Sequence, residues 1–89
     1  MSTKESTDLI IRPVSSESAL ERLEMENKLT LIVSPDANKV AIKAAVEKLY
    51  SVKVKSVNTS ISTSGEKKAI VALEKEFSAT ELATRIGLL

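Results

Sequence analysis

The sequence contains no cysteine and no histidine. The lack of cysteine excludes disulfides and thiolate metal sites, and the lack of histidine removes the commonest general base and metal ligand. With only two glycines, the chain has no glycine-rich loop that could cradle a phosphate. With one tyrosine, one phenylalanine and no tryptophan, it has no aromatic platform for stacking bases. The longest apolar run covers only residues 69–73, which is far below the roughly 18 residues of a membrane span.

What is present describes a small domain that acts by contact. The chain has 89 residues, 43% apolar and 28% charged, which is ordinary for a soluble globular protein. Residues 1–8 are polar and lack the apolar core of a signal peptide, so we expect a flexible tail there and a single domain over residues 9–89. The sequence contains no cluster of carboxylates and no residue that would activate a nucleophile, so no motif in it indicates catalysis. The sequence therefore predicts a cytoplasmic protein that is no enzyme and has no metal, cofactor or small-molecule substrate.

The charges are unevenly distributed along the chain. The formal net charge is only +1, but residues 39–68 hold seven lysines against two glutamates. Residues 1–38 hold four basic and seven acidic side chains, and residues 69–89 hold two basic and three acidic ones. A basic middle between acidic ends favours a polyanion bound on one face. The alternative is that these lysines form the solvated side of a helix and two strands.

The first half of the chain predicts two strands and a helix between them. The apolar residues 9–11 indicate a short buried strand, which a proline closes at position 13. Ser15 or Ser16 can cap a helix that runs to about Glu26 and has an acidic outer side. Residues 28–33 alternate in hydrophobicity with the period of a strand.

The second half predicts a helix, a hairpin and a last helix. Asp36 or Asn38 caps the helix, which ends near Tyr50. Residues 52–62 form a strand whose phase changes near Ser56, as a bulge or a late start of the strand would cause, and residues 67–73 form the return strand. A capping box opens the last helix at position 78, and a glycine at position 87 ends it. The order strand-helix-strand-helix-strand-strand-helix predicts an α+β fold, with helices against a mixed or antiparallel sheet.

Several separate strings of this sequence resemble one known family in order and spacing. They are residues 11–17 (IRPVSSE), 27–33 (NKLTLIV), 37–39 (ANK), 42–50 (IKAAVEKLY), 52–54 (VKV), 57–59 (VNT) and 67–73 (KKAIVAL). The family is the universal large-subunit ribosomal protein number twenty-three. The ending at residues 82–89 and the short hairpin resemble its archaeal form. The resemblance spans about residues 9–89.

This resemblance implies a fold, a function and a set of partners. The fold is a small α/β/α sandwich with a mostly antiparallel four-stranded sheet. Members are structural components of the large subunit that bind its ribosomal RNA beside the exit of the nascent-chain tunnel, among neighbouring ribosomal proteins. Their outer surface docks the signal recognition particle and the protein-conducting channel. The turn at residues 62–66 is too short for the long tunnel-reaching hairpin of bacterial members.

The expected binding residues come partly from the resemblance and partly from the basic middle segment. The resemblance assigns RNA contact to Arg12, Asn38, Lys39, Lys43, Asn58, Thr59, Lys67 and Lys68. The basic segment adds Lys53 and Lys55, which could instead be strand residues that face solvent and guard against aggregation. The resemblance also implies a factor-docking role for Glu17, and we expect Glu21 of the same acidic helix to share it. An alternative function is that of a free-standing α+β protein-interaction module without RNA.

Overall fold

The computed structural model describes residues 9–88, so the tail expected at residues 1–8 lies outside the described part. The elements follow each other in the predicted order. They are β1 (Ile10–Pro13), α2 (Glu17–Glu26), β2 (Lys28–Val33), α3 (Lys39–Tyr50), β3 (Val54–Ile61), β4 (Lys67–Leu73) and α4 (Ala79–Arg85). No helix within residues 9–88 is long and apolar enough to cross a membrane.

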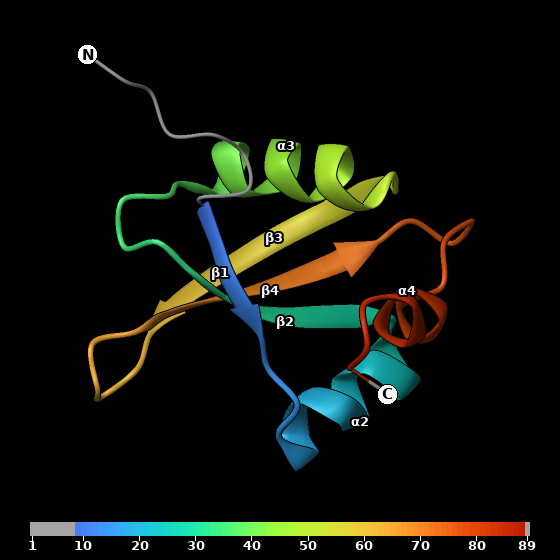
Figure 1. Ribbon diagram of the computed structural model, residues 1–89, viewed down its shortest axis with the longest axis horizontal. Coiled ribbons are helices and arrows are strands. Elements are labelled where there is room, and N and C mark those ends of the chain that lie inside the picture. Colours follow the sequence, from blue (N-terminus) through green and yellow to red (C-terminus); the bar gives the residue numbers. More distant parts are fainter. Residues whose placement is uncertain (1–8, 89) are drawn as a thin grey trace.

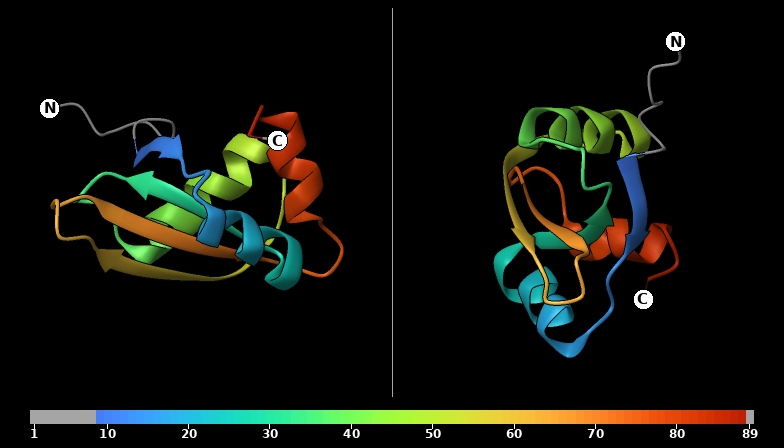
Figure 2. Two further views of the ribbon diagram at one scale, coloured as in Figure 1. Left: turned by 90° about the horizontal axis from the view of Figure 1, so that it is seen from below. Right: turned by 90° about the vertical axis from the view of Figure 1, so that its left-hand side faces the viewer.

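The four strands form one antiparallel sheet in the order β1-β2-β4-β3 (Figure 1). In the right-hand view of Figure 2, α3 lies above the strands and α2 lies below them. The helix α4 contacts both α2 and β2. The predicted sandwich with a helix on either side of an antiparallel sheet is therefore confirmed.

Each helix begins at a polar residue that accepts a hydrogen bond from its first turn. The Ser16 hydroxyl accepts from the backbone N–H of Ala19 at 3.3 Å, and the Asn38 side chain accepts from Ala41 at 2.8 Å. Ser78 caps α4 in the same way. These bonds satisfy amide groups that a helix start leaves unpaired, so the short elements begin at defined positions.

The hydrophobic core is one cluster, to which the helices α2, α3 and α4 and the strands β2, β3 and β4 contribute buried side chains. Its largest fully buried side chains include Leu23 of α2, Leu31 of β2, Ile42 of α3, Val71 of β4 and Leu82 of α4. The alternating residues of β2 and β4 that face α3 carry most of the strand contribution. The core thus fixes the sheet and the helices α2, α3 and α4 as one unit.

Two details of the strands differ from expectation. Ile11 was expected to be buried, but it is 58% exposed, because the β1–β2 pairing shifts register between Ile10 and Arg12. The strand β3 begins at Val54 rather than at position 52, because Ser51 ends α3 in the left-handed conformation (φ 56°). The expected bulge near Ser56 is confirmed by a register shift between Val54 and Ser56.

Candidate nucleic-acid interface

The outer side of α3 carries exposed lysines. Lys39, Lys43 and Lys48 are exposed, and no ion pair to their ammonium groups occurs within residues 9–88. Lys39 and Lys43 stand one turn apart on one flank of the helix, whereas Lys48 lies on the opposite flank, since a turn takes about 3.6 residues. The first flank therefore presents two adjacent cations to solvent.

The only acidic side chain of α3 is Glu47, and it is occupied inside the protein. Its carboxylate accepts a hydrogen bond from the backbone N–H of Val54 at 2.9 Å, at the start of β3. The carboxylate is thereby directed toward the sheet, where it ties the end of α3 to β3. The solvent side of α3 is left with a positive charge.

The start of β4 lies close to the start of α3. The Lys67 ammonium donates a hydrogen bond to the Ala37 carbonyl at 2.6 Å, directly before the capping residue Asn38. Lys67 is half-buried. Its ammonium group carries a positive charge and also holds the loop that leads into α3. This contact brings together Asn38, Lys39 and Lys67 from segments that are about 30 residues apart in sequence.

The pairing register of β3 and β4 decides which polar residues share a face. Thr59 pairs with Ala69, so it faces the α3 side of the sheet together with Lys67. Asn58 pairs with Ile70 and Ser60 with Lys68, so these residues face the other side. Lys67 and Lys68 therefore lie at the same end of the hairpin but on opposite faces of the sheet.

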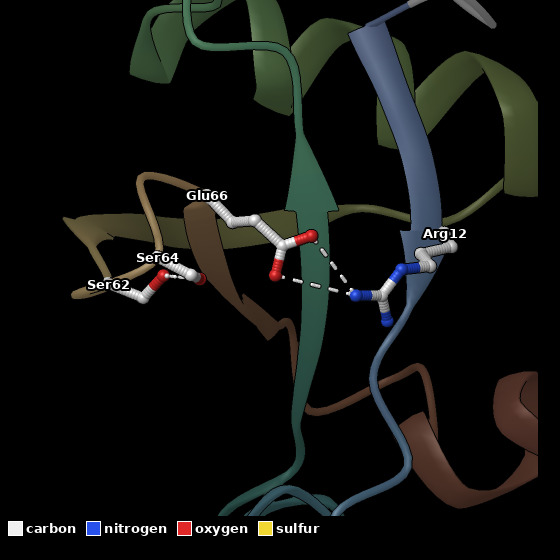
Figure 3. A network of polar contacts seen from close by, with 4 residues as sticks. All are labelled: Arg12, Ser62, Ser64 and Glu66. Carbon is white, nitrogen blue, oxygen red and sulfur yellow. Dashed lines mark hydrogen bonds and ion pairs between the residues drawn. The ribbon is translucent and has the colours of Figure 1, made fainter.

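Arg12 joins the face that carries Lys68. It pairs in register with Ile32, and Ile32 pairs with Lys68 on the next strand. The Arg12 guanidinium forms an ion pair with the carboxylate of Glu66, at 3.2 Å between Nη2 and Oε2 (Figure 3). Sequence reasoning missed Glu66, because its partner is 54 residues away and only the folded sheet brings the two together.

The predicted RNA-binding residues thus gather at one end of the sheet rather than on one face. We call this the hairpin end, and it comprises Arg12, Asn38, Lys39, Lys67 and Lys68, with Lys43, Asn58 and Thr59 next to it. Lys53 and Lys55 lie at the opposite end of β3, and both are exposed. The structure does not bring these last two residues to the hairpin end.

The surroundings of Lys55 are of mixed charge. Lys55 lines a hollow of about 520 Å³ together with two further lysines and three glutamates. Those residues are Lys28, Lys75, Glu26, Glu74 and Glu76. Lys28 is already paired with Glu26 at 3.1 Å. The charges of this hollow cancel, so it lacks the field that would favour a polyanion.

The acidic helix α2 lies on the side of the sheet that α3 leaves free (Figure 2). It carries four glutamates and one arginine, and both Glu17 and Glu21 are exposed. Glu21 lines a shallow groove with Ser18, Arg22, Met25 and Glu26, and Met25 is 84% exposed. The structure therefore places the two expected docking residues on an accessible surface, apart from the exposed lysines of α3.

Tyr50 belongs to the junction of α3 and α4 rather than to a binding surface. Burial raises the pKa of its phenol, and its ring packs against the core. Its backbone carbonyl accepts a hydrogen bond from Arg85 at 3.1 Å. Within residues 9–88 no group of three or more carboxylates is placed to hold a metal ion.

Comparison with known proteins gives one consistent result. The sequence pattern of the family described as "Ribosomal protein L23" matches residues 8–80. The chain is 52% identical over 81 residues to a protein of Thermoplasma acidophilum named "Large ribosomal subunit protein uL23", covering 91% of this chain and 95% of that protein. It is 48% identical over 77 residues to a Dictyostelium discoideum protein of the same name, covering 86% of this chain and 46% of that longer protein.

Proposed function

Because this chain belongs to the ribosomal protein L23 family, we propose that it binds large-subunit ribosomal RNA through its hairpin end. As a member of this family it is a non-enzymatic structural component of the large ribosomal subunit in the cytoplasm. Binding takes place beside the exit of the nascent-chain tunnel, among neighbouring ribosomal proteins. The acidic helix α2 faces outward there and docks targeting factors, the signal recognition particle and the protein-conducting channel.

The observation that carries the RNA part is the gathering of cations at the hairpin end. Lys39 and Lys43 on α3 have no carboxylate partner within residues 9–88, and the one glutamate of α3 is turned toward β3. Phosphates are the natural partners of such a surface, because binding them releases counterions from the RNA. Small polar groups beside the lysines, such as Asn38 and Thr59, can hydrogen-bond sugar and phosphate oxygens without reading sequence.

The RNA part is tested by removing cations and measuring the salt dependence of binding. We expect K39A/K43A to lower the slope of log affinity against log salt by about one unit for each lost phosphate contact. The measurement is filter binding of the full chain to a large-subunit ribosomal RNA transcript at several salt concentrations. The variant K48A/K75A removes the same charge from the opposite flank of α3 and from the β4–α4 turn, so its slope should stay near that of the parent chain. Equal slopes for both double variants would contradict the assigned surface.

The docking part concerns the exposed carboxylates of α2. We expect E17Q/E21Q to weaken binding of the signal recognition particle to large subunits that contain this chain, because a basic partner loses two charge contacts. Co-sedimentation of the particle with such subunits measures the effect. The variant E81Q/E76Q removes two exposed carboxylates from another surface, and its subunits should retain the particle. Undiminished binding to the E17Q/E21Q subunits would show that α2 is not the docking surface.

A further inference from the structure

Arg12 and Lys68 flank Ile32 on the sheet face that looks away from α3. The register pairs Arg12 with Ile32 and Ile32 with Lys68, so the backbones of the two cations are two strands apart, or about 10 Å. Arginine and lysine have apolar stems long enough to lie along the strand between them. Ile32 is only 3% exposed at this place. The side chains of the two cations therefore leave the sheet on the same face, on either side of one buried apolar residue.

The ion pair with Glu66 leaves part of the Arg12 guanidinium free. A single nitrogen, Nη2, donates to both carboxylate oxygens, at 3.2 and 3.5 Å. Nη1 and Nε point away from the carboxylate (Figure 3) and have no other partner among the described residues. The two-pronged edges of a guanidinium are Nε with Nη2 and Nη1 with Nη2, so Glu66 holds the corner that both edges share. The N–H groups of Nη1 remain open to solvent and can donate singly to a second anion.

Glu66 itself is fixed by the turn that precedes it. The backbone N–H of Ser62 donates to the Glu66 carbonyl at 2.9 Å, and the N–H of Gly65 donates to the Ser62 carbonyl at 3.0 Å. The hydroxyl groups of Ser62 and Ser64 lie 2.9 Å apart and close the same turn (Figure 3). Because Glu66 is two residues before Lys68, its side chain leaves the strand on the same face. The turn therefore fixes the backbone of Glu66, and its side chain leaves the strand on the face that Arg12 also occupies.

We propose that Arg12 and Lys68 form a site for one phosphate of the ribosomal RNA backbone, and that Glu66 is a positioning residue that keeps Nη1 of the guanidinium toward that phosphate. The proposal rests on the RNA binding proposed above and adds a specific site to it. With Nη2 bound to Glu66, Nη1 can donate to a phosphate oxygen only when the guanidinium plane is turned toward that oxygen. Holding one corner of the group supplies that orientation before RNA arrives.

When Glu66 is removed, the positioning role and simple electrostatics predict opposite changes in the affinity for RNA. A glutamate beside a cation lowers the local positive charge, so its removal should strengthen binding to a polyanion if charge alone matters. If Glu66 orients Arg12, its removal should weaken binding, although the protein becomes more positive. An exposed ion pair contributes little to the stability of a fold, so loss of folding should not obscure the result.

The test compares two glutamine substitutions that change the net charge equally. E66Q removes the partner of Arg12, whereas E81Q removes an exposed carboxylate from α4, far along the chain from this site. Binding of the full chain to a large-subunit ribosomal RNA transcript is measured at one salt concentration. We expect E81Q to bind as tightly as the parent chain or more tightly, and E66Q to bind about threefold to fivefold more weakly, as suits an exposed ion pair.

A second pair of variants asks whether Glu66 acts through the guanidinium. R12K keeps the positive charge but has no planar guanidinium to orient, so E66Q should cause no further weakening when it is combined with R12K. Equal or tighter binding of E66Q relative to E81Q would overturn the positioning role. If R12A binds normally while K39A/K43A does not, the site is wrong and the proposed function stands. If neither R12A nor K39A/K43A weakens binding, the proposed function itself is wrong.

Discussion

At the scale of single residues, Asn27 links two segments that are distant in sequence. It ends α2 in the left-handed conformation, with φ at 57°. Its side-chain Nδ2 donates to the carbonyl of Phe77 at 2.9 Å and to that of Leu73 at 3.4 Å, and its Oδ1 accepts from the N–H of Ala79 at 2.6 Å. One amide thereby attaches the loop between β4 and α4 to the junction of α2 and β2.

We expect N27G to lower the free energy of unfolding by about 2–4 kcal/mol, because glycine accepts the backbone conformation but leaves half-buried carbonyl and amide groups unpaired. Chemical denaturation measures the change. The control is S51G, which substitutes the other non-glycine residue with positive φ (56°), where the side chain makes no hydrogen bond among the described residues. S51G should leave stability unchanged or slightly raised. A loss of the same size in both variants would mean that backbone conformation, not the amide of Asn27, carries the effect.

Sequence alone could not predict either of the two side-chain networks described above. Asn27 bonds to residues 46–52 positions away, and Arg12 pairs with a residue 54 positions away. Neither partner has a distinguishing local pattern: Glu66 reads as part of a polar turn. Long-range polar contacts are fixed by strand register, and register becomes known only when the strands are paired.

At the scale of elements, the sequence best predicted the features that depend on residues close together in the chain. The caps Asn38 and Ser78, the left-handed stop at Gly87 and the bulge before Ser56 were all predicted from local residue types and are confirmed. Local rules succeeded there because a cap or a stop involves residues within one turn of each other. The exposure of Ile11 was missed, because it depends on how β1 pairs with β2.

Asn38 has two possible roles at this scale, as the cap of α3 and as an RNA ligand. Serine caps a helix about as well as asparagine does, but it lacks the amide group. We therefore expect N38S to keep the stability of the parent chain and N38A to lose about 1 kcal/mol. Thermal unfolding measures stability, and binding to the RNA transcript is measured in parallel. Weaker RNA binding by N38S would identify the amide as a ligand, whereas unchanged binding would leave Asn38 as a cap alone.

At the scale of the whole molecule, the basic segment of the sequence folds into a basic end and not a basic face. The family, the order of elements and the sandwich could be predicted from sequence, since several separate strings and strong periodicities agree. The arrangement of the charged residues could not, because neighbouring residues such as Lys67 and Lys68 take opposite faces of the sheet. Lys53 and Lys55 were grouped with the other lysines by position in the chain, yet the length of β3 separates them from the hairpin end.

The opposite charges of α3 and α2, on opposite sides of one thin sheet, give this small domain an electric dipole moment. A polyanion exerts a torque on such a dipole at distances comparable to the Debye length, which is about 8 Å at physiological ionic strength. The domain would rotate during its final approach so that α3 leads and α2 trails. Productive encounters during assembly would then be more frequent than random tumbling allows, and the rate of association would fall as salt is added.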